Sequence, residues 1–443
     1  MSTINRVATA NMYENSIRNI GARQNSLVEQ NEKLTAGKRV LRASDDPVAA
    51  AQAERAITRM ERIKVEQQAL DIQRNGVAQA ESSIGDAIGL IQNIRELMVS
   101  AGSGTLAQED RRIIAGQIDN LRDQLINVAN RKDTNGLPLL GALGSALTPF
   151  LGNSPDSFGG LAGQIGGSAV GIANMLDGDS AFMFQTKRDG VYTAELSNTA
   201  TPLAGRKFGT SEITVLDPKA VTGAEYEIVF GAVQPAPGTP PDPYNSIATY
   251  TIIDKNNTPL GDVTVTTAPF PNDKPKSIDI SLPGLKFTIN ASPYTDENRA
   301  LPPGTFADAA GGVTPGIRAG DTITLKPSSG IFESLDRAVA GIGKAADSNA
   351  AAQAVGQGLA SLDRGMERLQ SMRSYAGELL NRADRITGDQ ETRNIQLDAD
   401  RSRAEDLDLV QGSSDFQMTQ VGYQAALQSY AMVQKMSMFN YIS

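Results

Sequence analysis

The sequence predicts a mainly α-helical protein with a β-rich insert: both termini form a long helical rod of coiled-coil-like helices, and the middle forms a central all-β domain. Only Pro47 precedes residue 138, the other twenty prolines lie between Pro138 and Pro327, and none follows. A proline in a helix interior costs about 3 kcal/mol, so the flanks are free to be helical. Aromatic residues agree, because fourteen Phe and Tyr lie between residues 138 and 330, whereas Tyr13 is alone before them.

An apolar stripe at helical spacing runs through the N-terminal segment. Its members step alternately by four and three residues, which keeps them on one helix face, as in a coiled-coil seam. They are Tyr13, Ile17, Ile20, Gln24, Leu27, Asn31 and Leu34. Gly37 is expected to end this first helix.

A second helix is predicted to begin in the run Ser44, Asp45, Asp46 and Pro47. Asp46 can cap the first turn, and Pro47 fits that turn because its missing N–H is harmless there. Over residues 47–100 such a helix extends roughly 80 Å at 1.5 Å per residue, which indicates a rod. Its stripe again steps three and four: Val77, Ala80, Ile84, Ala87, Ile91, Ile94 and Met98.

Residues 102–104, with the sequence Gly-Ser-Gly, are expected to reverse the chain into a helical hairpin. Thr105 and Gln108 have the spacing of a capping box, which predicts the start of a third helix. The stripe of this helix is Ile114, Ile118, Leu121, Leu125 and Val128. The turn-rich segment 133–136 is expected to end the hairpin.

The segment 138–330 changes to Gly, Pro, Thr and aromatic residues, a composition typical of all-β domains. Alternating runs predict strands over 225–230, 248–253, 263–267, 286–289 and 322–325. Residues 139–174 are so rich in Gly and Ser that loops or poorly ordered structure are expected there.

The C-terminal flank repeats the helical pattern. A short helix is predicted from Phe332 to Ile342 and a long one through residues 362–386. Gly412 is expected to interrupt the long helix, and Ser413, Ser414 and Asp415 are expected to cap a last one. The stripe of this last helix is Phe416, Thr419, Tyr423, Ala426, Tyr430 and Val433.

The two terminal helices are expected to pair antiparallel, with both chain ends at one pole. Five apolar seam residues in the first helix yield roughly 7 to 15 kcal/mol when buried. Ordering some thirty residues costs on the order of 30 kcal/mol in backbone entropy, partly offset by hydrogen bonding. We therefore predict that both termini are disordered in the free protein and fold when copies pack together. The candidate assembly residues are Tyr13, Ile17, Ile20, Leu27, Leu34, Phe416, Tyr423, Tyr430, Val433 and Phe439.

Composition argues against most other functions. The chain has no His, Cys or Trp, which excludes disulfides, Cys or His metal sites and Ser-His or Cys-His catalysis. A net charge of −9 disfavours nucleic acid and anionic membranes as partners. No segment is apolar enough to span a membrane, and the N-terminus lacks the apolar core of a cleaved signal peptide. No catalytic residue, metal or cofactor is predicted.

Several local patterns have plain structural explanations. The Gly-Ser-Gly of residues 102–104 lacks the Gly-Lys that follows in a phosphate loop, and residues 254–262 have glycine at the wrong position for a calcium loop. The carboxylates Asp398, Asp400, Glu405 and Asp406 are expected to be solvated. The basic cluster of Lys38, Arg39 and Arg42 favours a solvated loop over a partner contact.

Motifs at both ends resemble a known family. Near the N-terminus these are Met12, Tyr13 and Glu14, then residues 34–40 (LTAGKRV) and 44–51 (SDDPVAAA). Near the C-terminus they are residues 423–428 (YQAALQ) and 437–442 (SMFNYI). Together they resemble flagellar hook-associated protein 3, the hook-filament junction family of the bacterial flagellin superfamily. The Ser-Asp-Asp-Pro run favours this family over flagellin itself.

The resemblance implies an inner layer of terminal helices, a helical rod and a variable outer β domain. It also implies uncleaved export through the flagellar type III apparatus to an extracellular place in the flagellum. There, copies form a ring between hook and filament. The implied partners are other copies of the chain, the other hook-filament junction protein, flagellin and a cytoplasmic export chaperone that protects the C-terminal helix.

The expected division of the chain has five parts. They are an N-terminal assembly helix and spoke loop (1–44), the N-terminal part of the rod (45–137), the β-rich outer domain (138–330), the C-terminal part of the rod (331–411) and the C-terminal assembly helix (412–443).

Three alternatives stay open. A divergent flagellin filament subunit is the nearest one. A surface-binding, adhesin-like module on a structural base is the second, and glycan binding by the insert that is lost on mutating exposed Tyr would support it. A carboxylate-only hydrolase within the insert is the third, and turnover by residues 145–330 would support it.

Overall fold

The computed structural model describes most of the chain. The described residues are 2–141, 149–150, 168–185, 189–198, 203, 208–236, 242–255, 264–271, 276–291, 305–307, 313–315, 317 and 319–442. They divide into two compact units. The terminal unit comprises Met1–Leu70 with Asp384–Ser443, and the central unit comprises Asp71–Ala383.

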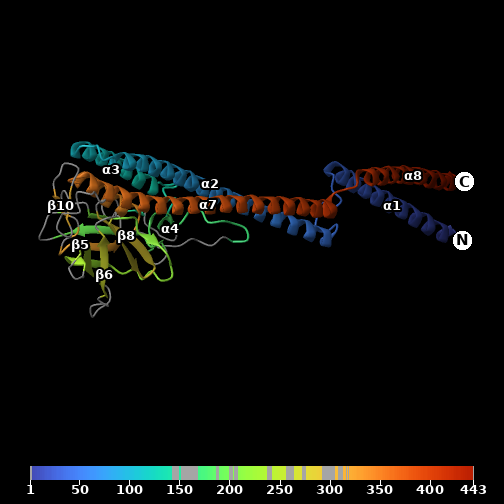
Figure 1. Ribbon diagram of the computed structural model, residues 1–443. Helices are drawn as coiled ribbons and strands as arrows, with labels where there is room; N and C mark the ends of the chain where they lie inside the picture. Colours follow the sequence, from blue (N-terminus) through green and yellow to red (C-terminus); the bar gives the residue numbers. More distant parts are fainter. Residues whose placement is uncertain are drawn as a thin grey trace. The chain divides into compact units, whose positions relative to one another are not determined.

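Four helices build the terminal unit. They are α1 (Ser2–Ala36), the first part of α2 (Pro47–Ala101), the last part of α7 (Ser348–Glu405) and α8 (Leu409–Ile442). Gly37, with φ +67°, follows α1, as the sequence predicted. Helices α1 and α8 lie side by side and antiparallel, with both chain ends at the same end of the pair (Figure 1). The predicted antiparallel pairing is therefore confirmed.

The predicted start of the last helix was wrong. Helix α8 begins at Leu409, because Asp408 Oδ1 accepts the backbone N–H groups of Val410 (2.9 Å) and Gln411 (3.3 Å). Ser413, Ser414 and Asp415 therefore lie inside the helix and cap nothing. Gly412 is also inside it, where a Cβ would meet Leu407 Cδ2 at 2.7 Å. The lack of a side chain at Gly412 makes room for the Leu407 side chain and does not break the helix.

The central unit contains the rest of α2 and α7 together with α3 (Gln108–Ala129), α4 (Gly178–Phe182) and α6 (Ile331–Lys344). Arg131, just after α3, pairs with Asp86 of α2 (2.6 Å), which confirms the predicted hairpin. The predicted capping box was wrong. The N-cap of α3 is Ala107, which makes no side-chain cap bond, whereas the Thr105 hydroxyl bonds that of Ser103 (3.0 Å).

The helical core of the central unit uses the predicted stripes. Its fully buried side chains include Ile84, Ile91, Ile94, Met98, Ile118, Leu125, Leu335, Ile342, Leu362 and Leu369. Arg122 of α3 pairs with Asp336 of α6 (2.8 Å), at the contact between these two helices.

The β domain belongs to the central unit and is built from antiparallel strands. One sheet has the order β1-β11-β4-β5-β6: β1 (Tyr192–Ser197), β11 (Thr322–Pro327), β4 (Tyr226–Ala236), β5 (Asp242–Asp254) and β6 (Thr264–Pro271). A second sheet joins β2 (Phe208–Thr210), β8 (Leu285–Ala291) and β3 (Thr214–Val215), with β7 (Lys276–Leu282) also pairing β8. A separate pair joins β9 (Thr305–Ala307) and β10 (Val313–Pro315).

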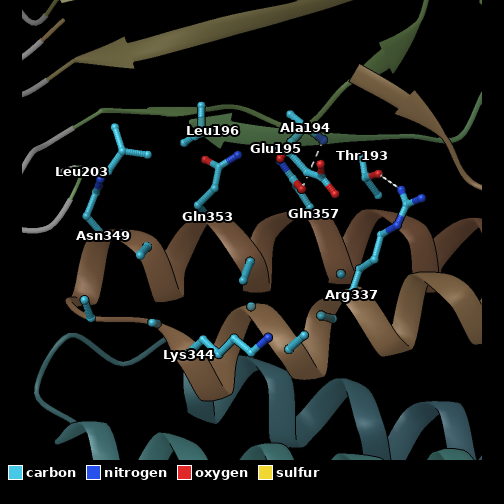
Figure 2. Close-up of a pocket in the computed structure, with 18 of the residues that line it drawn as sticks. Thr193, Ala194, Glu195, Leu196, Leu203, Arg337, Lys344, Asn349, Gln353 and Gln357 are labelled. Atoms are coloured by element: carbon cyan, nitrogen blue, oxygen red, sulfur yellow. Dashed lines mark hydrogen bonds between the residues drawn. The ribbon is translucent and has the colours of Figure 1, made fainter. Parts of the chain in front are cut away.

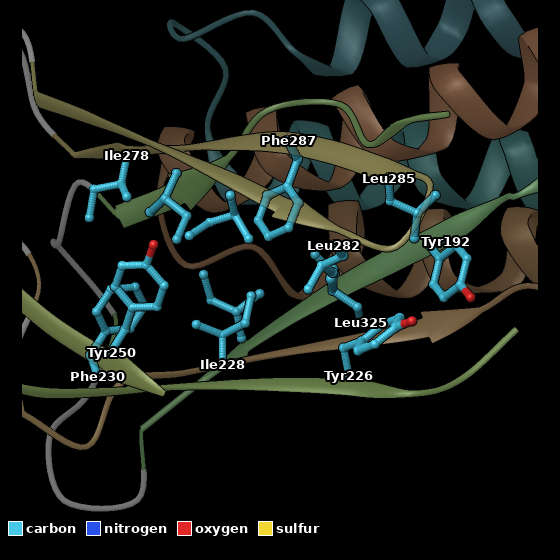
Figure 3. Packing of buried hydrophobic residues seen from close by; sticks show 14 of the residues in the cluster. Tyr192, Tyr226, Ile228, Phe230, Tyr250, Ile278, Leu282, Leu285, Phe287 and Leu325 are labelled. Carbon is cyan, nitrogen blue, oxygen red and sulfur yellow. The ribbon is translucent and has the colours of Figure 1, made fainter. Parts of the chain in front are cut away.

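Each of the five predicted strands overlaps an observed one, so the predicted fold class is confirmed. The two larger sheets enclose one apolar core, to which Ile228 and Phe230 of one sheet and Ile280 and Phe287 of the other contribute (Figure 3). Alternation along the strands sends every second side chain into this core. Residues 142–148, 151–167 and 256–263, which include most of the expected loop segment and of the rejected calcium loop, lie outside the described residues.

The turn between β7 and β8 depends on a glycine. Leu282 pairs with Leu285, and between them Gly284 has φ +74° and would direct a Cβ to within 2.5 Å of Asp217 O. We expect Gly284→Ala to destabilise the β domain by at least about 1–2 kcal/mol, because the left-handed conformation disfavours a Cβ and the space is filled. Thermal unfolding followed by the strand signal in circular dichroism measures this.

Gly116→Ala is the matched control, because Gly116 is helical and nothing lies within 4 Å of an added Cβ. That variant should be stabilised, by roughly 0.5–1 kcal/mol. An unchanged melting temperature for Gly284→Ala would contradict the prediction.

Candidate assembly interface

The α1–α8 pair brings most of the predicted assembly residues together. Ile20, Leu27 and Leu34 of α1 are half-buried, and so are Phe416, Tyr423 and Tyr430 of α8. These positions follow one face of each helix, as their spacing predicted. The side chains of Val433 and Phe439, which also lie in α8, are outside the described part.

Tyr13 and Ile17 stay more open, with 42% and 46% of their surface exposed. Tyr13 nevertheless contacts Tyr430: the ring centroids are 5.4 Å apart and the two hydroxyls form a 2.8 Å hydrogen bond. This hydrogen bond raises the pKa of the Tyr430 hydroxyl. In any other register of the two helices, this hydrogen bond is lost and the two hydroxyls lie against apolar side chains, which costs energy. The tyrosine pair therefore favours a single register of the two helices.

Helix α8 carries a second apolar face, which the sequence analysis missed. Val410, Met418, Val421 and Met432 are 81%, 66%, 65% and 65% exposed. At 100° per residue they lie on the side of α8 opposite the seam residues Phe416, Tyr423 and Tyr430. The signal was available, because this second stripe also steps at helical spacing, half a turn from the first. We call these four residues the outer face of α8.

The solvent side of α1 differs from the outer face of α8. Glu14 pairs with Arg18 (3.3 Å) and Glu29 with Lys33 (2.6 Å), which are ordinary i, i+4 surface pairs. A helix that is apolar on two opposite faces needs a neighbour on each of them. In this chain α1 covers one face of α8, and the other face is exposed.

The connector that follows α1 and the connector that precedes α8 are bonded to each other. Leu407 N donates to Gly37 O (2.9 Å) and Arg39 N donates to Glu405 O (2.7 Å). Lys38 and Asp406 form an antiparallel bridge, and the Lys38 ammonium pairs with Glu405 (3.0 Å). These two connectors, which are far apart in the sequence, are thus held together where the α1–α8 pair meets helices α2 and α7 within the terminal unit.

The run from Ser44 to Pro47 caps α2 as predicted. Asp46 Oδ1 accepts the N–H groups of Val48 (3.2 Å) and Ala49 (3.0 Å), and Pro47 is the first helical residue. Asp45 Oδ2 accepts the N–H groups of the preceding turn, from Leu41 (3.2 Å) and Arg42 (3.0 Å). Ser44 Oγ lies 3.4 Å from Asp45 Oδ1.

The basic cluster of the first connector has exposed side chains, as predicted for a solvated loop, and each of its members also pairs with a carboxylate of the chain. Lys38 contacts Glu405, Arg39 contacts Asp46 (3.2 Å) and Arg42 contacts Glu32 (3.5 Å). Arg39 also donates to Ala404 O (2.8 Å). Tertiary structure supplies these partners, because Glu405 and Ala404 lie more than 360 residues away in the sequence.

These carboxylates make the connector sensitive to acid. The backbone N–H of Ala49 and the side chain of Arg39 hold the pKa of Asp46 below its ordinary value of 3.8, and the N–H of Arg42 does the same for Asp45. A lowered pKa in the folded state adds stability that is fully present above the ordinary value and is lost as the pH falls from that value through the lowered pKa. We therefore expect the protection factors of residues 38–50, in which the intrinsic pH dependence of exchange is already removed, to fall selectively below about pH 4.

Asp46→Ala should lower the same protection factors already at pH 7, because it removes the cap of α2. Ser44→Ala, in the same exposed run, is the control and should have little effect. Protection factors that stay constant between pH 7 and 3 in the natural chain would contradict this prediction.

The described residues show no group of three or more Asp, Glu, His or Cys that could hold a metal ion. The carboxylates noted in the sequence are in ion pairs instead: Asp398 with Arg401 (2.8 Å), Asp400 with Arg403 (2.6 Å) and Glu405 with Lys38. Among the described helices, none is long and apolar enough to cross a membrane.

Known proteins resemble this chain in both sequence and structure. Residues 7–143 match the family model for the bacterial flagellin N-terminal helical region. Flagellar hook-associated protein 3 of Escherichia coli is 30% identical over 214 residues, which cover 48% of this chain and 64% of that protein. The resemblance to flagellar hook-associated protein 3 is confirmed. The protein of the same name from Salmonella typhimurium is 34% identical over 147 residues, covering 33% of this chain and 46% of that protein.

A solved structure supports the fold. Flagellar hook-associated protein 3 from Legionella pneumophila aligns with a TM-score of 0.55 at 20% identity, covering 79% of this chain and 97% of that one. At this identity the likeness concerns the fold. The chain spans less than two thirds of the length of the curated relatives to which it is compared.

Proposed function

We propose that this protein is a structural subunit of the bacterial flagellum that forms the junction between hook and filament. The matched flagellin N-terminal region and the similarity to hook-associated protein 3 support this function. The role is mechanical and involves no catalysis: a ring of copies joins the hook, which bends, to the filament, which is stiff.

The observation that carries the proposal is the double apolar character of α8. Its inner face packs on α1, and its outer face exposes Val410, Met418, Val421 and Met432. Exposed apolar surface of this kind is typical of an interface between proteins. Neighbouring copies of the same helix pair are the occupants that we propose for it.

The assembly residues therefore form two groups. Tyr13, Ile17, Ile20, Leu27 and Leu34 with Phe416, Tyr423 and Tyr430 form the seam within one copy, and the outer face of α8 contacts neighbours; Val433 and Phe439 stay assembly residues whose side we do not assign. In the run Ser44, Asp45, Asp46 and Pro47, the two aspartates hold the connector. In this scheme residues 1–44 and 409–442 are the assembly helices, 45–137 and 331–405 form the helical scaffold, and 138–330 is the outer domain.

The proposed partners follow from the same role. They are other copies of this chain, the other hook-filament junction protein, flagellin, and a cytoplasmic chaperone that covers α8 before export. We propose an extracellular place in the flagellum, reached through the flagellar export apparatus without cleavage of a signal peptide. Covering α8 before export prevents its outer face from adhering to other proteins.

Deletion of the gene tests the proposal. We expect hooks to remain while filament subunits are released into the medium, and immunogold label should lie only in a short zone beyond the hook. The second candidate is a divergent flagellin, which the flagellin name of the matched family model favours. Label along the whole filament would establish that candidate and contradict the junction.

A further inference from the structure

The central unit contains a cavity of about 470 Å³ between β1 and the helices α6 and α7 (Figure 2). Protein interiors are packed as densely as organic crystals, so a void of this size needs an explanation. Natural ligand pockets have similar volumes, and they combine apolar walls with a few polar groups that orient the ligand. Lys344 and Ala350 line the cavity and are exposed, so a small molecule can enter it from solvent.

One wall of the cavity is a row of side chains at positions 349, 353, 357 and 361 of α7. A spacing of four residues places them along one helix face. The first three are amides that bond backbone groups of β1 and β2, the edge strands of the two larger sheets. The bonds run from Asn349 Nδ2 to Phe208 O (3.1 Å), from Thr210 N to Gln353 Oε1 (2.7 Å) and from Gln357 Nε2 to Ala194 O (3.0 Å). These amides are therefore already occupied.

The fourth member of the row, Ser361, has no such bond. Ser361 is only 2% exposed and lines the cavity, yet no hydrogen bond within the described part of the chain involves its hydroxyl. Leaving a buried hydroxyl without a partner costs free energy, and native proteins rarely do so. A molecule inside the cavity can supply the missing partner.

Arg337 of α6 adds further donors at the same end of the cavity. Its Nη1 donates to the hydroxyl of Thr193, and its Nη2 donates to the carboxylate of Glu333. A guanidinium has five N–H donors, so others stay available to a ligand. Ser361 follows Gln357 by one helical turn, toward the end of the cavity where Figure 2 shows Thr193 and Arg337. This end therefore offers hydrogen-bond donors, which suit an acceptor.

The opposite end of the cavity is apolar. Figure 2 shows Leu203 and Leu196 at that end, away from Arg337, and Ala350 is one of several alanines that line the cavity there. The wall from residue 349 to residue 361 extends roughly 18 Å at 1.5 Å per residue. The cavity thus has the shape and the polarity of an elongated amphipathic molecule.

The charges around the cavity favour an anion. Of the two carboxylates that line it, Glu195 pairs with Lys326 (2.9 Å). Asp347 accepts a backbone N–H in the first turn of α7 (2.8 Å), where the helix dipole balances its charge. Lys344 also lines the cavity and has no ion-pair partner within the described residues. A positive charge is therefore left over at the mouth.

We propose that this cavity binds a small amphipathic carboxylate. Its carboxylate accepts hydrogen bonds from Ser361 and Arg337, because a carboxylate has only acceptors and the groups at this end are donors. Its aliphatic chain lies along the alanine wall toward Leu196 and Leu203, where it removes apolar surface from water. Lys344 at the mouth attracts the anion. The site belongs to the central unit and does not depend on the proposed role in assembly.

Titration of the full chain with octanoate tests the site. We expect saturable binding of a single octanoate per chain, measured by calorimetry, and a melting temperature that rises with octanoate concentration. Acetate lacks the chain and octanol lacks the charge, so each should bind at least about tenfold more weakly. No saturable binding of octanoate, or equal affinity for octanol, would overturn the proposal.

Substitutions at each end locate the bound molecule. Ala350→Leu fills the apolar end from an exposed position and should weaken octanoate binding at least about tenfold. Ser361→Ala removes one hydrogen bond and should weaken it about two- to tenfold. Ala352→Leu and Ser374→Ala are the matched controls, because both positions are exposed on α7 away from the cavity, and they should bind octanoate normally.

Octanoate can also adhere to the exposed apolar face of α8, so a variant of that face is titrated in parallel. Met418→Asp with Val421→Asp should leave octanoate binding unchanged, because neither residue lines the cavity. Loss of binding in this variant, or unchanged binding in Ala350→Leu, would place the octanoate elsewhere and overturn the proposal.

Discussion

Replacing Met418 and Val421 by aspartate is expected to prevent this protein from entering flagella while leaving its own fold intact. Both side chains lie on the outer face of α8 and are about two thirds exposed, so the isolated chain has no packing to lose there. In an assembly they become buried against a neighbouring copy. Each such side chain contributes about 1.5–3 kcal/mol when fully buried, and the pair therefore about 3–6 kcal/mol.

A loss of this size corresponds to a fall in affinity of more than about a hundredfold at each subunit contact. A buried aspartate without a partner adds a further penalty. Motility, and the amount of the protein in purified flagella, measure the effect. Circular dichroism of the isolated chain should stay unchanged.

Gln420→Asp with Gln424→Asp is the matched control, because it adds the same charges at exposed positions of the same helix. We expect this variant to assemble. Normal incorporation of the Met418 and Val421 variant would show that the outer face of α8 contacts nothing in the flagellum.

Replacing Leu27 and Tyr423 by aspartate is expected to separate α1 from α8 as well as to abolish assembly. Both residues are half-buried in the seam within a single copy. Each carboxylate there replaces an apolar side chain, the two losses together being worth roughly 3–6 kcal/mol, and leaves a charge without a partner in the seam. The seam variant thus differs from the outer-face variant by an effect inside the chain.

A cross-link between α1 and α8 at the Tyr13–Tyr430 contact distinguishes the two variants. Tyr13 and Tyr430 are in contact, so Tyr13→Cys with Tyr430→Cys should be joined within one chain by a short bismaleimide. We expect this product with the outer-face substitutions and its loss with the seam substitutions. Efficient cross-linking in the seam variant would contradict the prediction. Because the outer-face variant does not assemble, its cross-link in dilute solution would contradict the expectation from the sequence that the termini fold only when copies pack.

Local chemistry made much of the fold predictable. Twenty prolines confined to the middle of the chain mark the β domain, because few other positions tolerate them. Asp46 and Pro47 start α2 as predicted, since an N-cap needs only its own neighbours in the sequence. Heptad-like stripes identified the buried faces of α1, α2 and α8 for the same reason.

Predictions failed where a competing contact nearby decided the local structure, or where one pattern concealed another. Gly412 appeared to be a helix break, yet it lies inside α8 to make room for Leu407. Thr105 and Gln108 matched a capping box, but the Thr105 hydroxyl bonds Ser103 instead. The outer face of α8 was missed because the apolar stripe that faces α1 is enough by itself to predict this helix.

By itself the sequence determined which segments are helix and strand, the cap at Asp46 and the antiparallel pairing of the two ends. Each of these depends on spacing or on neighbouring residues. Only the tertiary structure decided that the two connectors bond each other, that α8 has an uncovered apolar side, and that amides of α7 bond the edges of both sheets. The bonds join groups separated by more than 130 residues, which no local pattern encodes. The uncovered side of α8 depends on which of its surfaces the other helices cover.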